Sequence, residues 1–142
     1  VDDGTAEVGT LDGAVDVEGD DGEITVDAVD ALRGEIDDGS LTVTEGTRLG
    51  DVQADDGKLD LAVDGVDDGA TVSADDGDVT VRLSQSLDLS VTVSTDDGAV
   101  QVADGVLNDI ETSDDETRGQ IGDGSDALTI EVDDGSVTLE PL

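Results

Sequence analysis

The sequence predicts an all-β protein built as a parallel β-solenoid, in which the chain coils and each turn stacks on the turn before it. Three observations carry this prediction. A short Asp-Asp-Gly segment recurs every 17–21 residues along most of the chain. Apolar residues follow this segment at alternate positions, as they do in half-buried strands. No stretch of the sequence sustains the 3.6-residue period of an amphipathic helix.

The repeat is defined by its opening segment. The segments begin at Asp2, Asp20, Asp37, Asp55, Asp75, Asp96 and Asp133. The steps between them are 18, 17, 18, 20, 21 and 37 residues, and the last step is about two periods. Near its middle, Asp114 and Asp115 are followed by Glu116 where glycine is expected, so we interpret that unit as degenerate. In each turn, glycine is expected to supply a positive φ, and an aspartate can bond to its own backbone.

Each Asp-Asp-Gly segment leads into a short strand whose apolar residues are two apart. These pairs are Ile24 and Val26, Leu41 and Val43, Leu59 and Leu61, Val79 and Val81, Val100 and Val102, and Val137 and Leu139. A second strand follows in the same unit, with apolar positions at Val15, Val17, Val52, Ala54, Val72, Ala74, Leu87, Leu89, Val91 and Val93.

Stacking these units about 4.8 Å apart places equivalent residues in inward-facing columns. One such column contains Val26, Val43, Leu61 and Val81. The chain length then corresponds to about seven to eight rungs. An antiparallel sandwich or barrel would also show alternation, but it does not need such a regular repeat.

Two segments depart from the repeat. Residues 103–122 form the longest stretch without clean alternation, and we expect a loop that leaves the rod there. Near the C-terminus, Pro141 lacks the N–H that a further strand would need, so we expect it to block one end of the rod. Because a head-to-tail contact needs both ends, this blocked end predicts a monomer, or a closed small oligomer, rather than a filament.

The composition excludes many functions. The 142 residues include 40 acids and only 5 bases, which gives a formal net charge of −35. Cys, Met, Trp, Tyr, Phe and His do not occur. The chain therefore lacks the residues of a disulfide framework, a zinc site, a Ser-His-Asp triad or an aromatic platform for bases. Its negative charge should repel nucleic acids and anionic membranes.

High net charge with modest hydrophobicity is also typical of disordered chains. Against disorder, the apolar residues alternate along the whole chain, and the acids fall in pairs beside glycine rather than in long blocks. The other interpretation is a folded protein adapted to molar salt. Two adjacent carboxylates about 5 Å apart repel by roughly 0.8 kcal/mol in water. At 1 M salt the Debye length falls to about 3 Å, and most of that repulsion disappears.

The sequence assigns no catalytic, cofactor-binding or metal-binding residues, and no cofactor is expected. Polysaccharide-cleaving β-helices use clustered acids, but the aromatic and basic residues that line their clefts are missing here. A ladder of aspartates could hold calcium, yet neither the nonapeptide calcium repeat nor an EF-hand loop is present. We therefore expect a solvated acidic ridge with diffuse Na⁺ or K⁺. The bases Arg33, Arg48, Lys58, Arg82 and Arg118 are expected to pair locally with neighbouring acids.

Three segments carry a family resemblance: SLDLSVTVSTDDGAVQV, RGQIGDG and DALTIEVDDGSVTL. With their recurring Asp-Gly turns and valine strands, they resemble the putative-adhesin family of β-strand-repeat domains of unknown function, in an acidic version similar to that of haloarchaea. The resemblance implies a right-handed parallel β-helix, often carried on exported or membrane-anchored proteins, and it implies no catalytic residues. The segment RLGDVQA, from Arg48 to Ala54, resembles the bactofilins, which are polymer-forming cytoskeletal β-helices.

Together these observations predict one β-solenoid domain over residues 1–142, not an enzyme, within a longer or processed protein. We expect a non-catalytic structural or interaction module of the surface-adhesin type, with a bactofilin-like cytoskeletal scaffold as the alternative. The expected partner is an unidentified protein or surface, not a nucleic acid, and the segment is not expected to insert into a membrane. An extracellular or membrane-anchored location is expected, although a cytoplasmic one stays open.

Overall fold

The computed structural model describes residues 2–67 and 69–142, so Val1 and Asp68 lie outside it. All of its regular elements are strands. They are β1 (Asp3–Val8), β2 (Leu11–Val26), β3 (Val29–Val66), β4 (Ala70–Leu83), β5 (Leu89–Thr95), β6 (Ala99–Val102), β7 (Asn108–Thr112), β8 (Glu116–Ile121) and β9 (Asp126–Pro141). Within these residues, no helix is long and apolar enough to cross a membrane. The all-β prediction is confirmed.

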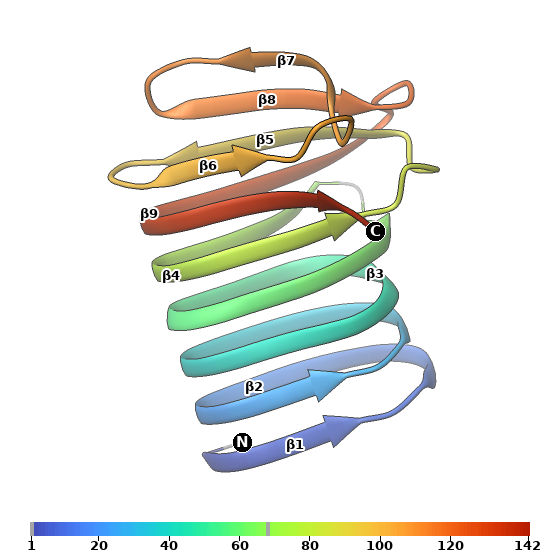
Figure 1. The fold of residues 1–142 in the computed structure, drawn as a ribbon. Coiled ribbons are helices and arrows are strands. Elements are labelled where there is room, and N and C mark those ends of the chain that lie inside the picture. The colour runs from blue at the N-terminus through green and yellow to red at the C-terminus, as the bar shows by residue number, and fades with distance from the viewer. Residues whose placement is uncertain (1, 68) are drawn as a thin grey trace.

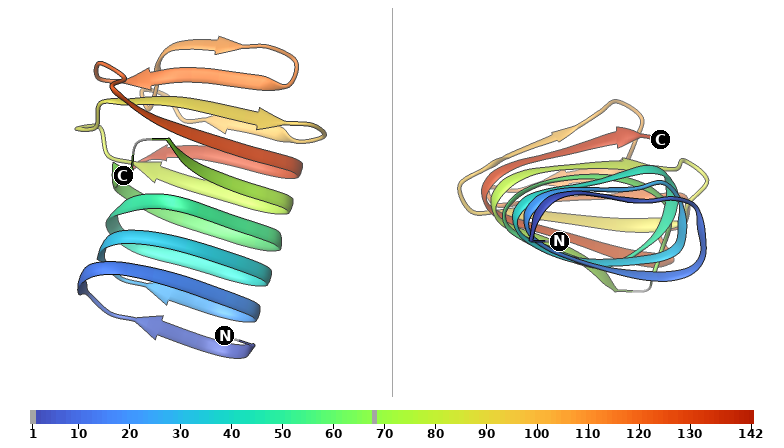
Figure 2. Two further views of the ribbon diagram at one scale, coloured as in Figure 1. Left: turned by 180° about the vertical axis from the view of Figure 1, so that it is seen from behind. Right: turned by 90° about the horizontal axis from the view of Figure 1, so that it is seen from below.

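The chain coils as a flattened solenoid, and the long strands bend around its corners without losing their pairing (Figures 1 and 2). β1 pairs in parallel with the second half of β2, and β2 pairs in parallel with β3. β3 then pairs in parallel with β4. Each rung therefore has two flat sides joined by two edges, and the Asp-Asp-Gly segments form one of these edges.

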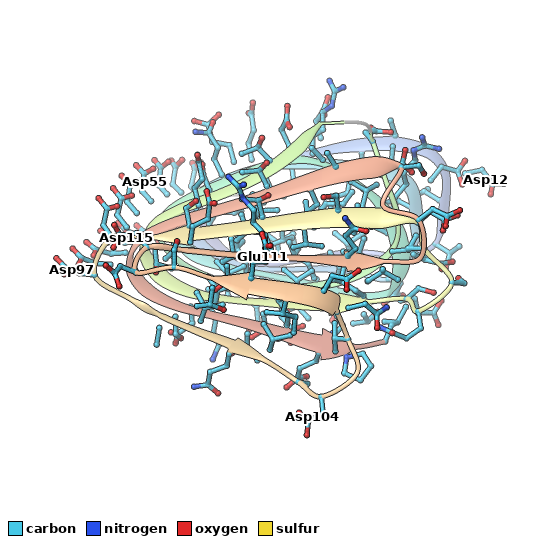
Figure 3. The ribbon with its side chains drawn as sticks, turned by 90° about the horizontal axis from the view of Figure 1, so that it is seen from above. Asp12, Asp55, Asp97, Asp104, Glu111 and Asp115 are labelled. Atoms are coloured by element: carbon cyan, nitrogen blue, oxygen red, sulfur yellow. The ribbon has the colours of Figure 1, made fainter. Side chains whose placement is uncertain are left out.

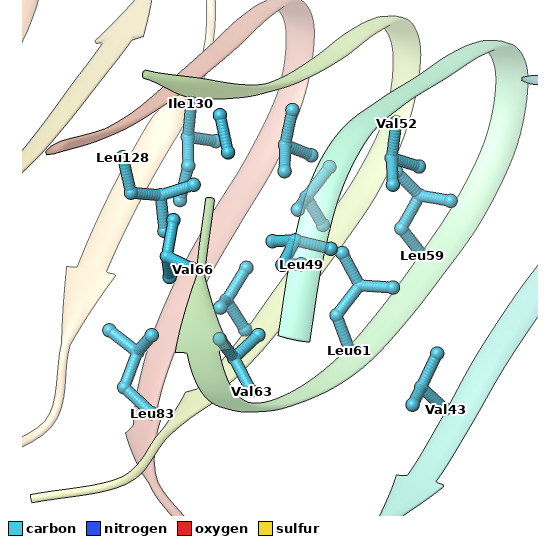
Figure 4. Close-up of a cluster of buried hydrophobic side chains, with 14 of the residues drawn as sticks. Val43, Leu49, Val52, Leu59, Leu61, Val63, Val66, Leu83, Leu128 and Ile130 are labelled. Carbon is cyan, nitrogen blue, oxygen red and sulfur yellow. The ribbon is translucent and has the colours of Figure 1, made fainter. Parts of the chain in front are cut away.

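The apolar columns that the alternation predicts fill the interior. Val26, Val43, Leu61 and Val81 are all completely buried. Val26 lies opposite Val43, and Leu61 lies opposite Val81. Figure 4 shows Val43 and Leu61 in this core with side chains contributed from the opposite side of the coil. The predicted register of this part of the chain is confirmed.

The last rungs do not stack in chain order. β4 pairs with the C-terminal strand β9, and β9 pairs on its other side with β5 and β6. The order along the stack is therefore β1, β2, β3, β4, β9, β5, β8 and β7, with β6 beside β9 (Figure 1). The prediction that each repeat stacks on its predecessor is wrong from β4 onward. The C-terminal strand β9 occupies the position next to β4 that the following repeat would take if the rungs stacked in chain order.

The returning chain crosses below β5 in a tight loop around Asp88. Its side-chain Oδ1 accepts a hydrogen bond from the Asp123 backbone N–H at 2.9 Å, and its carbonyl accepts one from the Asp126 N–H at 3.0 Å. Gly122 has φ 61°, and a Cβ there would lie 2.1 Å from Asp88 Oδ1. This crossing places the start of β9 beneath β5, so the crossover decides the order of the last rungs.

Residues 103–122 close the end of the rod, so the prediction of a loop leaving the rod is wrong. Val106 and Leu107 are buried in the end of the core. β7 and β8 form an antiparallel hairpin, and β8 pairs antiparallel with β5. The apparent degenerate repeat at Asp114 and Asp115 is the turn of this hairpin.

Pro141 does not block an end of the rod either. It lies opposite Leu83 inside the stack, and the Leu142 N–H donates to the Leu83 carbonyl at 2.9 Å. A proline is tolerated there because β6 ends at Val102, opposite Leu139, so no strand above needs its missing N–H.

Candidate functional site

The most distinctive surface is the edge formed by the Asp-Asp-Gly corners, which we name the acidic ladder. In spatial order it consists of Asp2 and Asp3, Asp20 and Asp21, Asp37 and Asp38, Asp55 and Asp56, Asp75 and Asp76, Asp133 and Asp134, and Asp96 and Asp97. Figure 3 shows Asp55 and Asp97 on this edge, with Asp115 beside them and Asp12 on the opposite edge. The predicted stacking of the Asp-Asp-Gly corners along one edge is confirmed, with the C-terminal corner inserted before the Asp96 corner.

Close backbone stacking requires glycine at every corner of the ladder after the first, Gly4, where a Cβ would meet nothing within 4 Å. A Cβ on Gly77 would lie 1.9 Å from the carbonyl oxygen of Gly57, and a Cβ on Gly135 would lie 1.9 Å from that of Gly77. Positive φ occurs in this series only at Gly4 and Gly22, within the part of the chain that is described. The predicted reason for glycine, a left-handed turn conformation, is therefore wrong for most corners. The corners instead continue the strands, and the rungs approach too closely for any side chain.

Gly77→Ala is expected to destabilise the fold by about 3 kcal/mol, because the new Cβ overlaps a backbone atom that cannot move aside. Gly9→Ala is the matched control, since a Cβ there meets nothing within 4 Å. Urea unfolding of both variants at constant salt checks the prediction. Equal stability of the two variants would show that the corners do not stack at this distance.

Two carboxylates of the ladder, Asp38 and Asp76, have a pKa raised above the ordinary value. Partial loss of water between the stacked corners, followed by the charges of Asp56 and Asp21, raises the pKa of Asp38. The same loss of water, followed by the charges of Asp56 and Asp134, raises the pKa of Asp76. Folding therefore favours the protonated form of both groups. Their contribution to stability is fully present below the ordinary value of 3.8 and is lost as the pH rises through the raised pKa.

Asp76→Asn is expected to raise the melting temperature by a few degrees at neutral pH and at the lowest salt that keeps the chain folded. Asp12→Asn removes the same charge from the opposite edge and should raise it less (Figure 3). The difference should shrink in 2 M KCl, which screens the ladder, and as the pH falls through the raised pKa of Asp76, because the wild-type carboxyl then loses its charge. Identical shifts for the two variants at all salts would mean that the stacked carboxylates do not strain the fold.

The described residues contain no cluster of three or more acids arranged to hold a metal ion. The calcium alternative therefore gains no support from the geometry of the ladder. The carboxylates run in two columns with roughly 4.8 Å between rungs. Such an array attracts counterions along its length rather than at one point.

Three of the bases pair locally, as expected. Arg48 Nε lies 2.5 Å from Asp67 Oδ1, and Arg118 Nε lies 2.5 Å from Glu116 Oε1. Arg82 Nη2 donates to Asp60 Oδ1 at 2.8 Å and to the Val43 carbonyl at 3.3 Å. Since Arg82 is the most enclosed of these three, its bridge between rungs is the one most expected to stabilise the stack.

Shallow depressions lie on the surface of the described part of the chain. One of about 220 Å³ is lined by Asp16, Glu18, Arg33, Glu35 and Gln53, among others. Its polar groups are carboxylates, a guanidinium and an amide, without a nucleophile held beside a base. The sequence had assigned no site residues, and this depression provides no reason to assign a catalytic one.

The fold and the repeat place the chain among the β-solenoid repeat domains. It matches the family described as Toastrack DUF4097 over residues 6–140, and it belongs to that family. The chain also resembles the crystal structure of a putative cell adhesion protein from Clostridium sporogenes, with 12% sequence identity and a TM-score of 0.38. That alignment covers 99% of this chain and 92% of the other. No curated protein matches the chain.

Proposed function

We propose that this Toastrack domain is a non-catalytic interaction module, displayed at the cell surface in the manner of an adhesin and adapted to high salt. A rigid rod with flat polar sides supports the proposal, because such a scaffold presents side chains at fixed spacing. On one side, Thr25 lies opposite Thr42, and Thr80 lies opposite Thr138, in a column that also contains Asp60. We name this column the threonine side. Its hydroxyl groups and carboxylates suit hydrogen bonding to a protein or glycan surface.

The charge pattern supports adaptation to molar salt. Stacked carboxylates destabilise the fold in dilute solution, and bound or diffuse K⁺ or Na⁺ screens them. We also propose that the coil is right-handed with about seven to eight rungs, and that it functions as a monomer within a longer protein. The closed β7–β8 end is a poor surface for stacking, which favours a module over a bactofilin-like polymer.

Binding of fluorescently labelled domain to intact cells of the source organism, at their growth salt, tests this function. Saturable binding is expected, and Thr42→Arg with Thr80→Arg on the threonine side should reduce it. Thr92→Arg with Thr129→Arg is the matched control, because these threonines occupy paired strands of the opposite side. Antibody against the natural protein should label intact cells. Labelling only after lysis, or an absence of saturable binding, would contradict the proposal.

A further inference from the structure

Aspartate directly precedes glycine at twelve positions of the chain, and this pair is prone to spontaneous isomerisation. The glycine amide nitrogen attacks the aspartate Cγ, so a C–N bond forms and a C–O bond of the carboxyl breaks. The carboxyl OH leaves as water together with the amide proton, and a five-membered succinimide results. Water then opens the succinimide at its main-chain carbonyl and gives isoaspartate, whose main chain runs through Cβ and Cγ and is one carbon longer.

The reaction requires rotation about the aspartate Cα–C bond, and the stacked corners restrict this rotation. Gly57 lies opposite Gly77, and Gly77 lies opposite Gly135, all within paired strands. The Gly98 corner is packed in the same way, since a Cβ there would lie 2.2 Å from the Gly135 carbonyl oxygen. An aspartate of the ladder can therefore react only when its corner opens locally.

Asp104 and Gly105 lie instead at the centre of the turn that follows β6. The Val106 N–H donates to the Ala103 carbonyl at 3.3 Å, and Gly105 has φ 81°, as in a type II turn. The peptide between Asp104 and Gly105 takes no part in that hydrogen bond, so it can rotate while the turn persists. Both residues are exposed, and a Cβ on Gly105 would meet nothing within 4 Å. Figure 3 shows Asp104 pointing away from the rod.

Two further Asp-Gly bonds are more constrained than this turn. The Asp123 N–H donates to Asp88 Oδ1 at 2.9 Å, which ties down the crossover loop. Asp12 lies in β2 between Leu11 and Ala14, and both of these residues pair with β3. The turn after β6 therefore combines the free peptide and the exposed carboxyl that the reaction needs.

We propose that Asp104 is the site at which the folded domain forms isoaspartate, and that this modification loosens one end of the core. The turn leads from β6 to Val106 and Leu107, which are 0% and 5% exposed. Leu107 packs so closely on Gly119 that a Cβ there would lie 2.8 Å from the Leu107 Cβ. An extra main-chain carbon in the turn displaces these two residues, and a closely packed core has no room for the displacement. This chemistry does not depend on the proposed function.

Incubation of the folded domain in 2 M KCl at neutral pH, followed by peptide mapping that distinguishes isoaspartate from aspartate, tests the inference. Isoaspartate should form at Asp104 at least about tenfold faster than at any stacked corner. Asp76 is the most stringent comparison. Loss of water between the corners raises the pKa of Asp76, which keeps more of its carboxyl in the protonated form that loses water. In concentrated urea the difference between Asp104 and the corners should disappear, because the fold no longer restricts the backbone.

Asp104→Glu keeps the charge but would have to form a six-membered ring, which closes far more slowly. This variant should lose most of the isoaspartate of the aged domain. Wild-type protein that carries the modification should melt several degrees lower than fresh protein, and aged Asp104→Glu should not. Asp97→Glu is the matched control, because it makes the same change beside Gly98 in a stacked corner. It should age as the wild type does.

Equal isoaspartate at Asp76 and Asp104 in the folded domain would overturn the assignment of the site. Ageing of Asp104→Glu at the wild-type rate would overturn it as well. An isoaspartate-containing domain that melts at the temperature of fresh protein would refute the loosening of the core.

Discussion

Removing residues 126–142 is expected to abolish cooperative folding. β9 contributes Leu128, Ile130, Val132, Val137 and Leu139 to the core, each with no more than 1% of its surface exposed. At about 1.5–3 kcal/mol for each buried side chain, these residues supply about 7–15 kcal/mol, which equals the whole net stability of a typical domain. The deletion would also expose the edges of β4, β5 and β6, and open edges promote aggregation.

The matched control is removal of residues 1–10 from the other terminus. β1 lies at the end of the stack, and Ala6 and Val8 are only half-buried. In a solenoid that stacked in chain order, both termini would be terminal rungs and would be equally easy to remove. We expect thermal unfolding of residues 11–142 to remain cooperative, while residues 1–125 show none. A cooperative transition in residues 1–125 near that of the intact chain would contradict the inserted position of β9.

Transfer to dilute buffer is expected to unfold the intact domain. With 40 acids against 5 bases, and with acidic corners stacked on one another, carboxylate repulsion acts along the whole rod. Each close pair costs about 0.8 kcal/mol when unscreened, and many such pairs exceed a net stability of about 5–15 kcal/mol. Far-ultraviolet circular dichroism should show β-structure in 2 M KCl and much less in 10 mM KCl.

Two controls separate screening from other effects of salt. A concentrated sucrose solution favours burial without screening charge, so it should rescue less structure than KCl does. A chelator at constant ionic strength should leave the melting temperature unchanged, since we expect no specific calcium requirement. A drop of many degrees would reveal a bound divalent cation. Equal stability in 10 mM and 2 M KCl would refute the salt adaptation, and a coil spectrum at every salt would indicate disorder.

The part of the fold that depends on local alternation could be predicted from the sequence. The inward positions Val26, Val43, Leu61 and Val81 follow from a period of two within strands and a period of about 18 between them. The acidic ladder follows from the same repeat. Both features require only that equivalent residues stack, which holds whichever rung is the neighbour.

The order of the last rungs could not be predicted, because the corners are chemically interchangeable. The Asp133 corner stacks as well on the Asp75 corner as on any other, so local sequence does not identify its neighbours. The step of 37 residues between Asp96 and Asp133 indicated that something intervened. We interpreted it as a degenerate rung, whereas it contains a hairpin and a crossover. The crossover is held by a hydrogen bond from Asp123 to Asp88, and a contact between residues so far apart in the sequence is not visible in the local pattern.

The stacking order is tested most directly by disulfide cross-linking, because the chain has no native cysteine. Thr80 lies opposite Thr138, and Gln101 lies on the other side of Thr138. Neighbouring strands are about 4.8 Å apart, within the Cα separation of a disulfide, whereas next-nearest strands are about twice as far apart. Under mild oxidation in 2 M KCl, Thr80→Cys with Thr138→Cys should cross-link within one chain. Thr80→Cys with Gln101→Cys should not, and efficient cross-linking of that second pair instead of the first would show that the rungs stack in chain order.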